Sequence, residues 1–408
     1  MQFSENSGTM IKSLIPKLKR HIADRNKSRD SKFNKSLDGL LLLLYNEIHS
    51  GANYVKNRIG TKCLRPIINK KGKHVKYNSQ YFSEEIQEYI NAHMKHQLLY
   101  KCDIEGREIT VIFGILGEAE LENLEKYDQY AKFIYSWLYV CYKFSLGRCS
   151  KTLSIYLYLT PIVKVFPQGT TKILGSSEVN TAFTYNCQSA GEIFIYREEE
   201  WKKVFIHETF HTFGFDFNKN EARNLYNYVG NIFPIESAFN VEEAYVETWA
   251  RIIHAGYESY ASLKNRSDTA EFLLYFRFSL QMERLFSLQQ MHNVLHYMGI
   301  DYNLLCSLDL QEKQAAAPLY RENSNVFAYY VLSGILMNDY YGFLLWCSKH
   351  NSTLFRFNTS STGVKSFIEF IEGGYRAHNL LRVLDTVQKQ SLSHKTLRMS
   401  VTETASYL

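Results

Sequence analysis

Hydrophobic positions in the middle of the chain follow first the period of a strand and then that of a helix. The run REITVIFGIL, residues 107–116, reads as a strand, and residues 118–144 then carry apolar side chains at helical spacing. Three more runs rich in β-forming residues follow, at 152–160, 179–185 and 192–197. A helix is expected next, because the acidic residues 198–200 suit a helix start and Gly214 suits its end. The order strand, helix, three strands, helix indicates an α+β fold.

The parts on either side of this region are predicted to be mostly helical. Residues 1–100 are basic, and a Gly-, Asn- and Lys-rich stretch around 51–78 is typical of loops or a small hairpin. Helical periodicity continues after Gly214 in four segments, residues 241–263, 269–298, 325–350 and 364–387. We therefore expect a basic N-terminal extension, a central α+β domain, a helical C-terminal subdomain and a flexible tail, at 1–100, 101–263, 264–387 and 388–408.

Composition places the 408-residue chain among folded proteins, and its charge adds one candidate surface. Hydrophobic residues make up 45% and only 6 residues are proline, which excludes a largely disordered chain. The formal net charge is +6. Basic residues gather in two clusters, Lys17, Lys19, Arg20, Arg25, Lys27, Arg29 and Lys32, and Lys70, Lys71, Lys73 and Lys76. Such clusters can bind nucleic acid, an acidic protein partner or anionic lipid, although a solvated arm is their more common meaning.

The cysteines and the first residues bear on the compartment. Seven cysteines are scattered without a CxxC pair, so neither a disulfide framework nor a cysteine zinc site is indicated, and a reducing setting fits best. The start MQFSENSG lacks a signal pattern, and the apolar run Leu40 to Leu44 is too short to span a bilayer. We therefore expect an intracellular, cytoplasmic protein with no transmembrane segment.

One motif carries specific chemistry. Residues 207–211 read His-Glu-Thr-Phe-His, and on a helix the two histidines lie one turn apart on one face, where both can bind one Zn²⁺ ion. Glu208, beside the first histidine, can then take a proton from zinc-bound water. The alternative is a chance match on a core helix. The apolar neighbours Val204, Phe205 and Ile206 favour the metal site, because burial strengthens metal-ligand electrostatics.

A catalytic zinc site usually has a third protein ligand, for which the sequence offers two candidates. In one class of sites the ligand lies just past the helix-ending glycine, but Phe217 holds that position and Asp216 is one residue short. In another class a glutamate comes from a later helix, where Glu243 would bind the metal and Glu247 would accept the free N–H of His207. We prefer Glu243. The alternative for these glutamates is a solvated acidic helix face.

These motifs resemble those of the gluzincin metallopeptidases. Their HExxH is similar to residues 207–211, and their ExxxE, which carries the third ligand and its supporting acid, is similar to 243–247. The run EAYVETWARIIHA also resembles the glutamate helix of anthrax lethal factor-like peptidases, and NTAFTY, from Asn180 through Ala182, resembles the edge strand that thermolysin-like enzymes pair with substrate backbone. The gap from His211 to Glu243 is longer than in thermolysin. The Lys-, Asn- and Tyr-rich, proline-poor composition is also similar to that of uncharacterised metallopeptidases of large DNA viruses.

The resemblance implies a zincin-like catalytic domain, built of a small mixed sheet and the motif helix, over residues 107–263. The expected activity is hydrolysis of a peptide or protein substrate, with zinc as cofactor and Glu208 as general base. Donors that could stabilise the oxyanion are Tyr226, Tyr228, Tyr245 and His254, the last lying on roughly the same helix face as Glu243.

Two rival readings stay open. The first is a non-catalytic protein that keeps a zincin-like fold as a scaffold and binds nucleic acid or an acidic partner through its basic N-terminal region. The intact Glu208 argues against it, because a purely structural zinc site needs no base beside its ligand. The second is a helical interaction protein with a chance HExxH.

Overall fold

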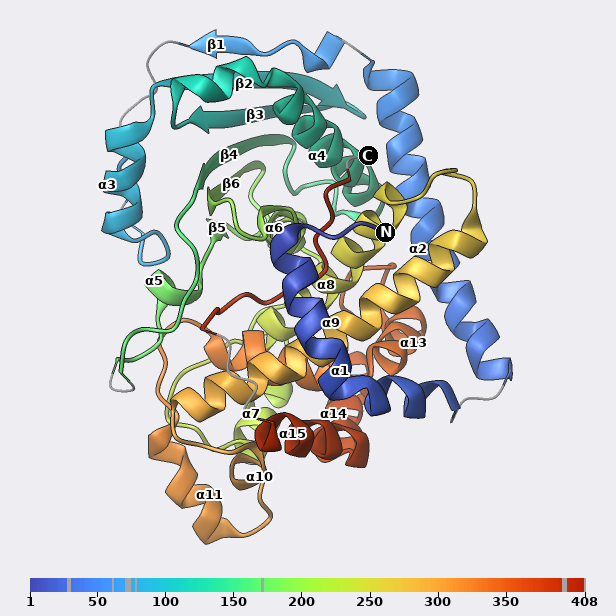
Figure 1. Ribbon diagram of the computed structural model, residues 1–408, viewed down its shortest axis with the longest axis vertical. Helices are drawn as coiled ribbons and strands as arrows, with labels where there is room; N and C mark the ends of the chain where they lie inside the picture. The colour runs from blue at the N-terminus through green and yellow to red at the C-terminus, as the bar shows by residue number, and fades with distance from the viewer. Residues whose placement is uncertain are drawn as a thin grey trace.

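The chain folds around one mixed β-sheet with helices packed beside and below it (Figure 1). The computed structural model describes residues 1–27, 31–60, 62–69, 75–77, 79–169, 172–390 and 395–406. In Figure 1 the sheet lies at the top, helices α7, α10, α11, α14 and α15 gather at the bottom, and α6, α8 and α9 lie between them. The predicted α+β class is confirmed at this level.

The sheet has six strands in the order β1-β2-β3-β4-β6-β5. Their bounds are Ile67–Asn69 (β1), His96–Ile104 (β2), Arg107–Ile115 (β3), Thr152–Thr160 (β4), Ala182–Thr184 (β5) and Ala190–Arg197 (β6). Strands β3, β4 and β6 are parallel, whereas β1, β2 and β5 pair antiparallel with their neighbours. The strands predicted from the sequence are present, and β5 lies at an edge of the sheet.

Strand β2 corrects the predicted domain boundary at residue 100. It pairs with β3 along its whole length, from His96 opposite Ile115 to Ile104 opposite Arg107. The turn between them uses Glu105 and Gly106, both with positive φ of 53° and 78°, a conformation that suits tight hairpins. The boundary therefore falls inside a strand, and the expected N-terminal extension contributes to the sheet of the central domain.

Helices make up most of the rest of the chain. Their bounds are Glu5–Lys27 (α1), Ser31–Tyr54 (α2), Glu84–His93 (α3), Leu124–Phe144 (α4), Ser176–Val179 (α5), Trp201–Phe213 (α6), Arg223–Ile232 (α7), Val241–Ala261 (α8), Thr269–Tyr297 (α9), Tyr302–Leu305 (α10), Leu310–Ala316 (α11), Ser333–Asn338 (α12), Tyr340–His350 (α13), Ser361–Gly374 (α14) and His378–Lys389 (α15). Among the described residues, no helix combines the length and the apolar character needed to cross a membrane.

Two predicted helices are each divided in the structure. The segment 325–350 breaks at Asp339, whose side chain accepts a hydrogen bond from the amide of Gly342 and so starts α13. The segment 364–387 breaks after Gly374, at the end of α14. Apolar periodicity did not reveal these breaks, because the helices on both sides of each break bury an apolar face in the same core.

One cluster of buried apolar side chains extends from Ile11 in α1 to Val401 near the C-terminus. It includes strands β2, β3, β4 and β6 as well as helices from all three of the larger predicted parts. The boundary expected at residue 263 therefore separates helices α8 and α9 that share one core. The main result of this packing is that α6 lies in the interior, between β6 and α8.

The expected flexible tail is wrong for residues 395–406, which we call the C-terminal segment. Leu397 and Val401 in this segment are fully buried, and Figure 1 shows it as a red trace passing α6, α8 and α9. Its backbone amides donate in turn to three buried carboxylates, those of Glu200, Glu283 and Glu258. Polar composition suggested a loose tail, but two buried acids on α8 and α9 and a third at the N-cap of α6 provide acceptors for this polar backbone.

The basic clusters fall partly outside the described residues. Lys17, Lys19 and Arg20 are exposed on α1, whereas Arg29 and Lys70, Lys71 and Lys73 lie outside the part of the chain that the structure describes. An acidic or nucleic-acid partner at this region stays a prediction.

Candidate metal centre

Helix α6 presents both motif histidines from the interior of the protein. Nearly all of its side chains are buried, including His207 and Glu208 at 6% and 7% exposed. The helix ends at Gly214, whose φ of 66° is in the left-handed region that glycine adopts easily. Its amide donates to the carbonyl of His211 at 3.1 Å. The predicted helix and its glycine stop are therefore present.

Three potential ligand atoms form a compact triangle. The Nε2 atoms of His207 and His211 are 3.3 Å apart, and the Oε2 atom of Glu243 on α8 lies 3.1 Å from the first and 3.5 Å from the second. Ligand atoms about 2.0–2.1 Å from a tetrahedral zinc ion stand roughly 3.3 Å from one another. The three edges thus have the size that a tetrahedral metal requires. Among the described residues this is the group of histidine, cysteine and acidic side chains that is arranged to hold a metal ion.

The Nδ1 atom of each imidazole, which faces away from the triangle, contacts a carboxylate. The Nδ1 atom of His207 lies 3.1 Å from Oε2 of Glu247, as the sequence predicts. The Nδ1 atom of His211 lies 2.6 Å from Oδ2 of Asp216. Asp216, the rejected ligand candidate, therefore contacts the outer side of a histidine instead of joining the triangle. Both contacts favour the tautomer that donates from Nδ1 and leaves the Nε2 lone pair free for a metal.

Glu247 is itself held by two buried cations. Nζ of Lys203 lies 2.9 Å from both carboxylate oxygens, and Nε of Arg251 lies 3.0 Å from one of them. Burial alone would raise the pKa of Glu247, but Lys203, Arg251 and His207 hold it well below its usual range. Lys203 was not among the site residues predicted from the sequence. The signal was available, because Lys203 lies one helical turn before His207 on α6.

Electrostatics keep Glu243 ionised. Burial tends to raise the pKa of Glu243, but the imidazoles of His211 and His207 hold it well below its usual range. Glu208 shows the opposite result, because burial raises its pKa above the usual value although both histidines lower it. The site therefore combines an ionised carboxylate in the triangle with a neighbouring carboxyl group of greater basicity, as a general base requires.

A pocket lies between α6 and the edge of the sheet. It is lined by His207 and Glu208, by the residues that lead into β5, and by side chains from four other segments: Lys164, Val179, Asn180, Thr181, Ala182, Lys203, Val204, Glu247, Tyr329 and Met399. Strand β5 pairs with β6 on one side only, so it is the edge strand at this pocket. Asn180 and Ala182, the predicted edge-strand residues, both line it. The side-chain hydroxyl of Thr181 is buried there without a hydrogen-bond partner in the described part of the chain.

Tyr329 also lines this pocket, but no sequence pattern distinguishes it from the other tyrosines, of which the chain has 30 in all. It lies in a π-helical segment, Phe327–Leu332, of a kind often found at functional sites. Its ring centroid is 5.8 Å from that of His207. Burial raises the pKa of Tyr329, and the charges of Glu243 and Glu208 raise it further, so its hydroxyl stays protonated and can donate a hydrogen bond.

The structure does not bring Tyr245 or His254 to this cluster. Tyr245 is two residues after Glu243 and faces the other side of α8, where its hydroxyl donates to the carbonyl of Phe355 at 2.7 Å. His254 lies about 16 Å farther along the helix axis, with Glu258 at 3.5 Å and 3% exposure. The expectation placed His254 on the right helix face but did not account for this axial distance.

The other tyrosine candidates also lie elsewhere. The ring of Tyr226 faces Lys219, and its hydroxyl is buried without a hydrogen-bond partner among the described residues. The pKa of Tyr228 is raised to about 12 by burial and by a hydrogen bond to Glu372. Neither residue lines the pocket beside Glu208.

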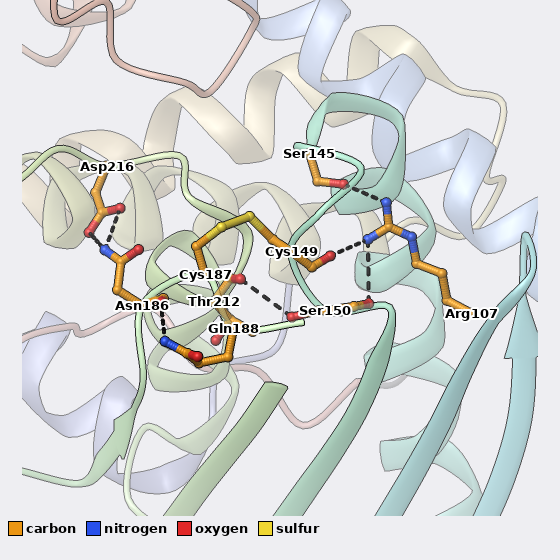
Figure 2. Close-up of a disulfide and its surroundings, with 9 residues drawn as sticks. All are labelled: Arg107, Ser145, Cys149, Ser150, Asn186, Cys187, Gln188, Thr212 and Asp216. Carbon is orange, nitrogen blue, oxygen red and sulfur yellow. Dashed lines mark hydrogen bonds between the residues drawn. A yellow bond between two sulfur atoms is a disulfide. The ribbon is translucent and has the colours of Figure 1, made fainter. Parts of the chain in front are cut away.

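A disulfide between Cys149 and Cys187 corrects the expectation from the cysteine spacing. The two residues are 38 positions apart, and the fold brings together the loop before β4 and the turn between β5 and β6 (Figure 2). Sequence spacing could not reveal this contact, because it depends on the parallel pairing of β4 and β6. A disulfide is typical of oxidising compartments, so it argues against the reducing setting, and the cellular location stays a prediction.

Comparison with known proteins does not assign the chain to a family. No protein-family model matches it, and no curated protein matches its sequence. The geometry of the centre is therefore the basis for a functional proposal.

Proposed function

We propose that the protein is a zinc-dependent metallopeptidase in which His207, His211 and Glu243 hold the metal and Glu208 is the general base. The observation that carries the proposal is the triangle of ligand atoms, with edges of 3.1, 3.3 and 3.5 Å. Three protein ligands leave a fourth position of a tetrahedral ion open, as catalytic zinc sites do.

The donor set favours zinc over the common hard cations. Two imidazole nitrogens and one carboxylate suit Zn²⁺, whereas Ca²⁺ and Mg²⁺ prefer sites made of oxygen atoms alone. When bound, zinc would act as a Lewis acid that lowers the pKa of a water molecule toward neutral pH and polarises a carbonyl group. The contacts of Glu247 and Asp216 to the outer nitrogens support this assignment, since ligating histidines almost always have such partners.

The residues around the centre have separate roles in the proposed reaction. Glu208 takes a proton from the attacking water and passes it to the leaving amine. Tyr329, whose pKa stays high, donates a hydrogen bond to the carbonyl oxygen as negative charge develops on it. The free edge of β5 pairs with the backbone of an extended peptide, so that side-chain pockets set specificity.

The test compares zinc content and peptide cleavage in matched variants. We expect wild-type protein to bind one zinc ion and cleave a peptide library, and Glu208→Gln to bind zinc equally but cleave nothing, because an amide cannot accept the proton. Glu236→Gln, the same change at an exposed site, is the control. Zinc binding without cleavage by the wild type would favour the scaffold reading, and cleavage by Glu208→Gln would refute the mechanism.

Ligand variants test the metal assignment separately. His207→Ala and Glu243→Ala should each lose tight zinc binding, because each removes one corner of the triangle. Asp216→Ala should keep all three ligands and weaken zinc about 10- to 100-fold, the usual effect of losing a histidine's outer partner. Stoichiometric zinc in both His207→Ala and Glu243→Ala would show that the site is misassigned.

A further inference from the structure

The disulfide is part of a chain of contacts that ends at a proposed metal ligand. In Figure 2 the amide of Asn186 points at the carboxylate of Asp216. Its Nδ2 atom lies 3.1 Å from each of the two carboxylate oxygens. Oδ2 of Asp216 contacts Nδ1 of His211 at 2.6 Å. Asn186 is therefore one hydrogen bond farther from the centre than Asp216.

The position of Asn186 depends on its neighbour Cys187. The turn that carries both residues is exposed at 185–186 and at 188–190, so packing alone holds it weakly. Backbone hydrogen bonds from Ser150 to Gln188 at 2.7 Å and from Thr152 to Ser189 at 3.2 Å attach only its far end to the chain that enters β4. Cys187 is attached at two points: its amide donates to the carbonyl of His211 at 3.1 Å, and its sulfur is bonded to Cys149. Both attachments direct the turn toward the end of α6.

Cys149 provides a rigid anchor for this turn. It is fully buried, and its carbonyl accepts a hydrogen bond at 2.7 Å from the guanidinium of Arg107 at the start of β3. The same guanidinium bonds Ser145 at the end of α4 at 3.2 Å and lies 4.4 Å from the ring centre of Tyr142. The disulfide thus connects an exposed turn to the junction of the sheet with α4.

The disulfide also packs against the end of the metal-bearing helix. A side chain added at Gly214 would lie 3.5 Å from the sulfur of Cys149 and 3.6 Å from Cβ of Cys187. The cross-link therefore occupies the space directly beside the last turn of α6, which carries His211.

From this geometry we propose that Asn186 is a positioning residue for His211, acting through Asp216, and that the Cys149–Cys187 disulfide holds Asn186 in place. The inference rests on the proposed metal site. Asn186 fixes both oxygens of Asp216, which in turn fixes the ring of His211 so that Nε2 faces the other two ligands. Breaking the disulfide releases the turn, and the affinity for zinc falls. Metal affinity is thereby linked to the redox state of this cysteine pair.

A phosphine reduces the disulfide in this test. The phosphine takes the oxygen of one water molecule and becomes a phosphine oxide, while the S–S bond accepts two electrons and two protons to give two thiols. Because new thiols can themselves bind zinc, the double variant Cys149→Ser/Cys187→Ser provides the same loss of cross-link without them.

The experiment measures zinc affinity of the full chain by competition with a chromophoric chelator. Asn186→Ala and the double serine variant should each weaken zinc about 3- to 10-fold, less than the 10- to 100-fold typical of a direct histidine partner. Phosphine reduction of the wild type should weaken zinc similarly. Asn220→Ala, an exposed asparagine four residues after Asp216 in the loop between α6 and α7, is the control and should match the wild type. The triple variant, which combines Asn186→Ala with the two serine substitutions, should bind zinc no more weakly than the double serine variant. The reason is that both changes act through the same contact to Asp216.

A second readout separates positioning from general loss of structure. In the Co²⁺-substituted protein, Asn186→Ala should shift the visible absorption bands, which report ligand geometry, while the unfolding free energy of the metal-free protein stays within about 0.5 kcal/mol of wild type. Unchanged bands, zinc affinity of Asn186→Ala equal to wild type, or fully multiplicative losses in the triple variant would each overturn the inference. Zinc binding by the wild type without peptide cleavage would contradict the proposed function alone.

Discussion

Replacing Glu247 with leucine tests how the buried charges support the proposed metal centre. The change removes the acceptor that holds Nδ1 of His207 and leaves Lys203 and Arg251 without their shared carboxylate. Lys203 and Arg251 are positive and Glu247 is negative, so the three side chains carry a net charge of +1. Removing Glu247 raises this net charge to +2. Leaving buried charge uncompensated costs about 3–5 kcal/mol of unfolding free energy. Loss of the histidine partner should also weaken zinc about 10- to 100-fold, or roughly 1.4–2.7 kcal/mol.

Two further variants separate these effects. Adding Lys203→Met to Glu247→Leu returns the net charge to +1, so part of the lost stability should come back. Zinc affinity should not recover, because His207 still lacks its acceptor. Glu247→Gln should keep its zinc affinity but lose stability. Its amide oxygen can still accept a hydrogen bond from His207, whereas the negative charge is lost.

Denaturant unfolding of the metal-free protein measures the unfolding free energy, and chelator competition measures the zinc affinity. The reasoning is wrong if Lys203→Met restores zinc affinity in the Glu247→Leu background, because Glu247 would then act through charge balance and not through the orientation of His207. It is also wrong if Glu247→Leu binds zinc as tightly as the wild type.

Other predictions concern the C-terminal segment and the pocket. Burial raises the pKa of Glu200, but nearby cations bring it to about 2. The ionised carboxylate should therefore contribute about 3 kcal/mol to the free energy of unfolding above pH 5, and this contribution should be lost as the pH falls toward 2. Acid unfolding of Glu200→Gln should accordingly show a shallower pH dependence than that of the wild type. Glu283→Ala removes an oxygen that accepts four hydrogen bonds from the C-terminal segment, so it should cost more than about 4 kcal/mol in urea unfolding and increase hydrogen exchange at 395–406; unchanged exchange would contradict this role. Tyr329→Phe should lower kcat about 100- to 1000-fold without loss of zinc, whereas Tyr245→Phe should leave kcat unchanged; the opposite result would exchange their roles.

Local patterns predicted those parts of the site that depend on sequence neighbours. The one-turn spacing of His207 and His211, the stop at Gly214 and the pair Glu243 and Glu247 are all properties of single helices, and the structure has each of them. The edge position of β5 could also be anticipated, from the family resemblance of its residues.

Other contacts join segments that are distant in sequence, and periodicity holds no information about them. Tyr329 reaches the centre from a segment more than 80 residues beyond Glu243. The disulfide depends on which strands are neighbours in the sheet, and that order was not predicted. Tyr245 and His254 were misplaced for a different reason: their positions follow from helix geometry, since Tyr245 faces away from Glu243 and His254 is several turns farther along α8.

The burial of the C-terminal segment affects the order of events during synthesis. Ser400 donates to Glu200 from a position 200 residues later in the chain. At about 5–20 residues per second, a ribosome needs roughly 10 to 40 s to make that stretch. During this interval the carboxylate at the start of α6 lacks the amides that satisfy it in the finished protein. We therefore expect the helix that carries His207 and His211 to reach its final stability only after residues 395–404 have left the ribosome. Loading of the proposed metal site would then be a late, post-translational step.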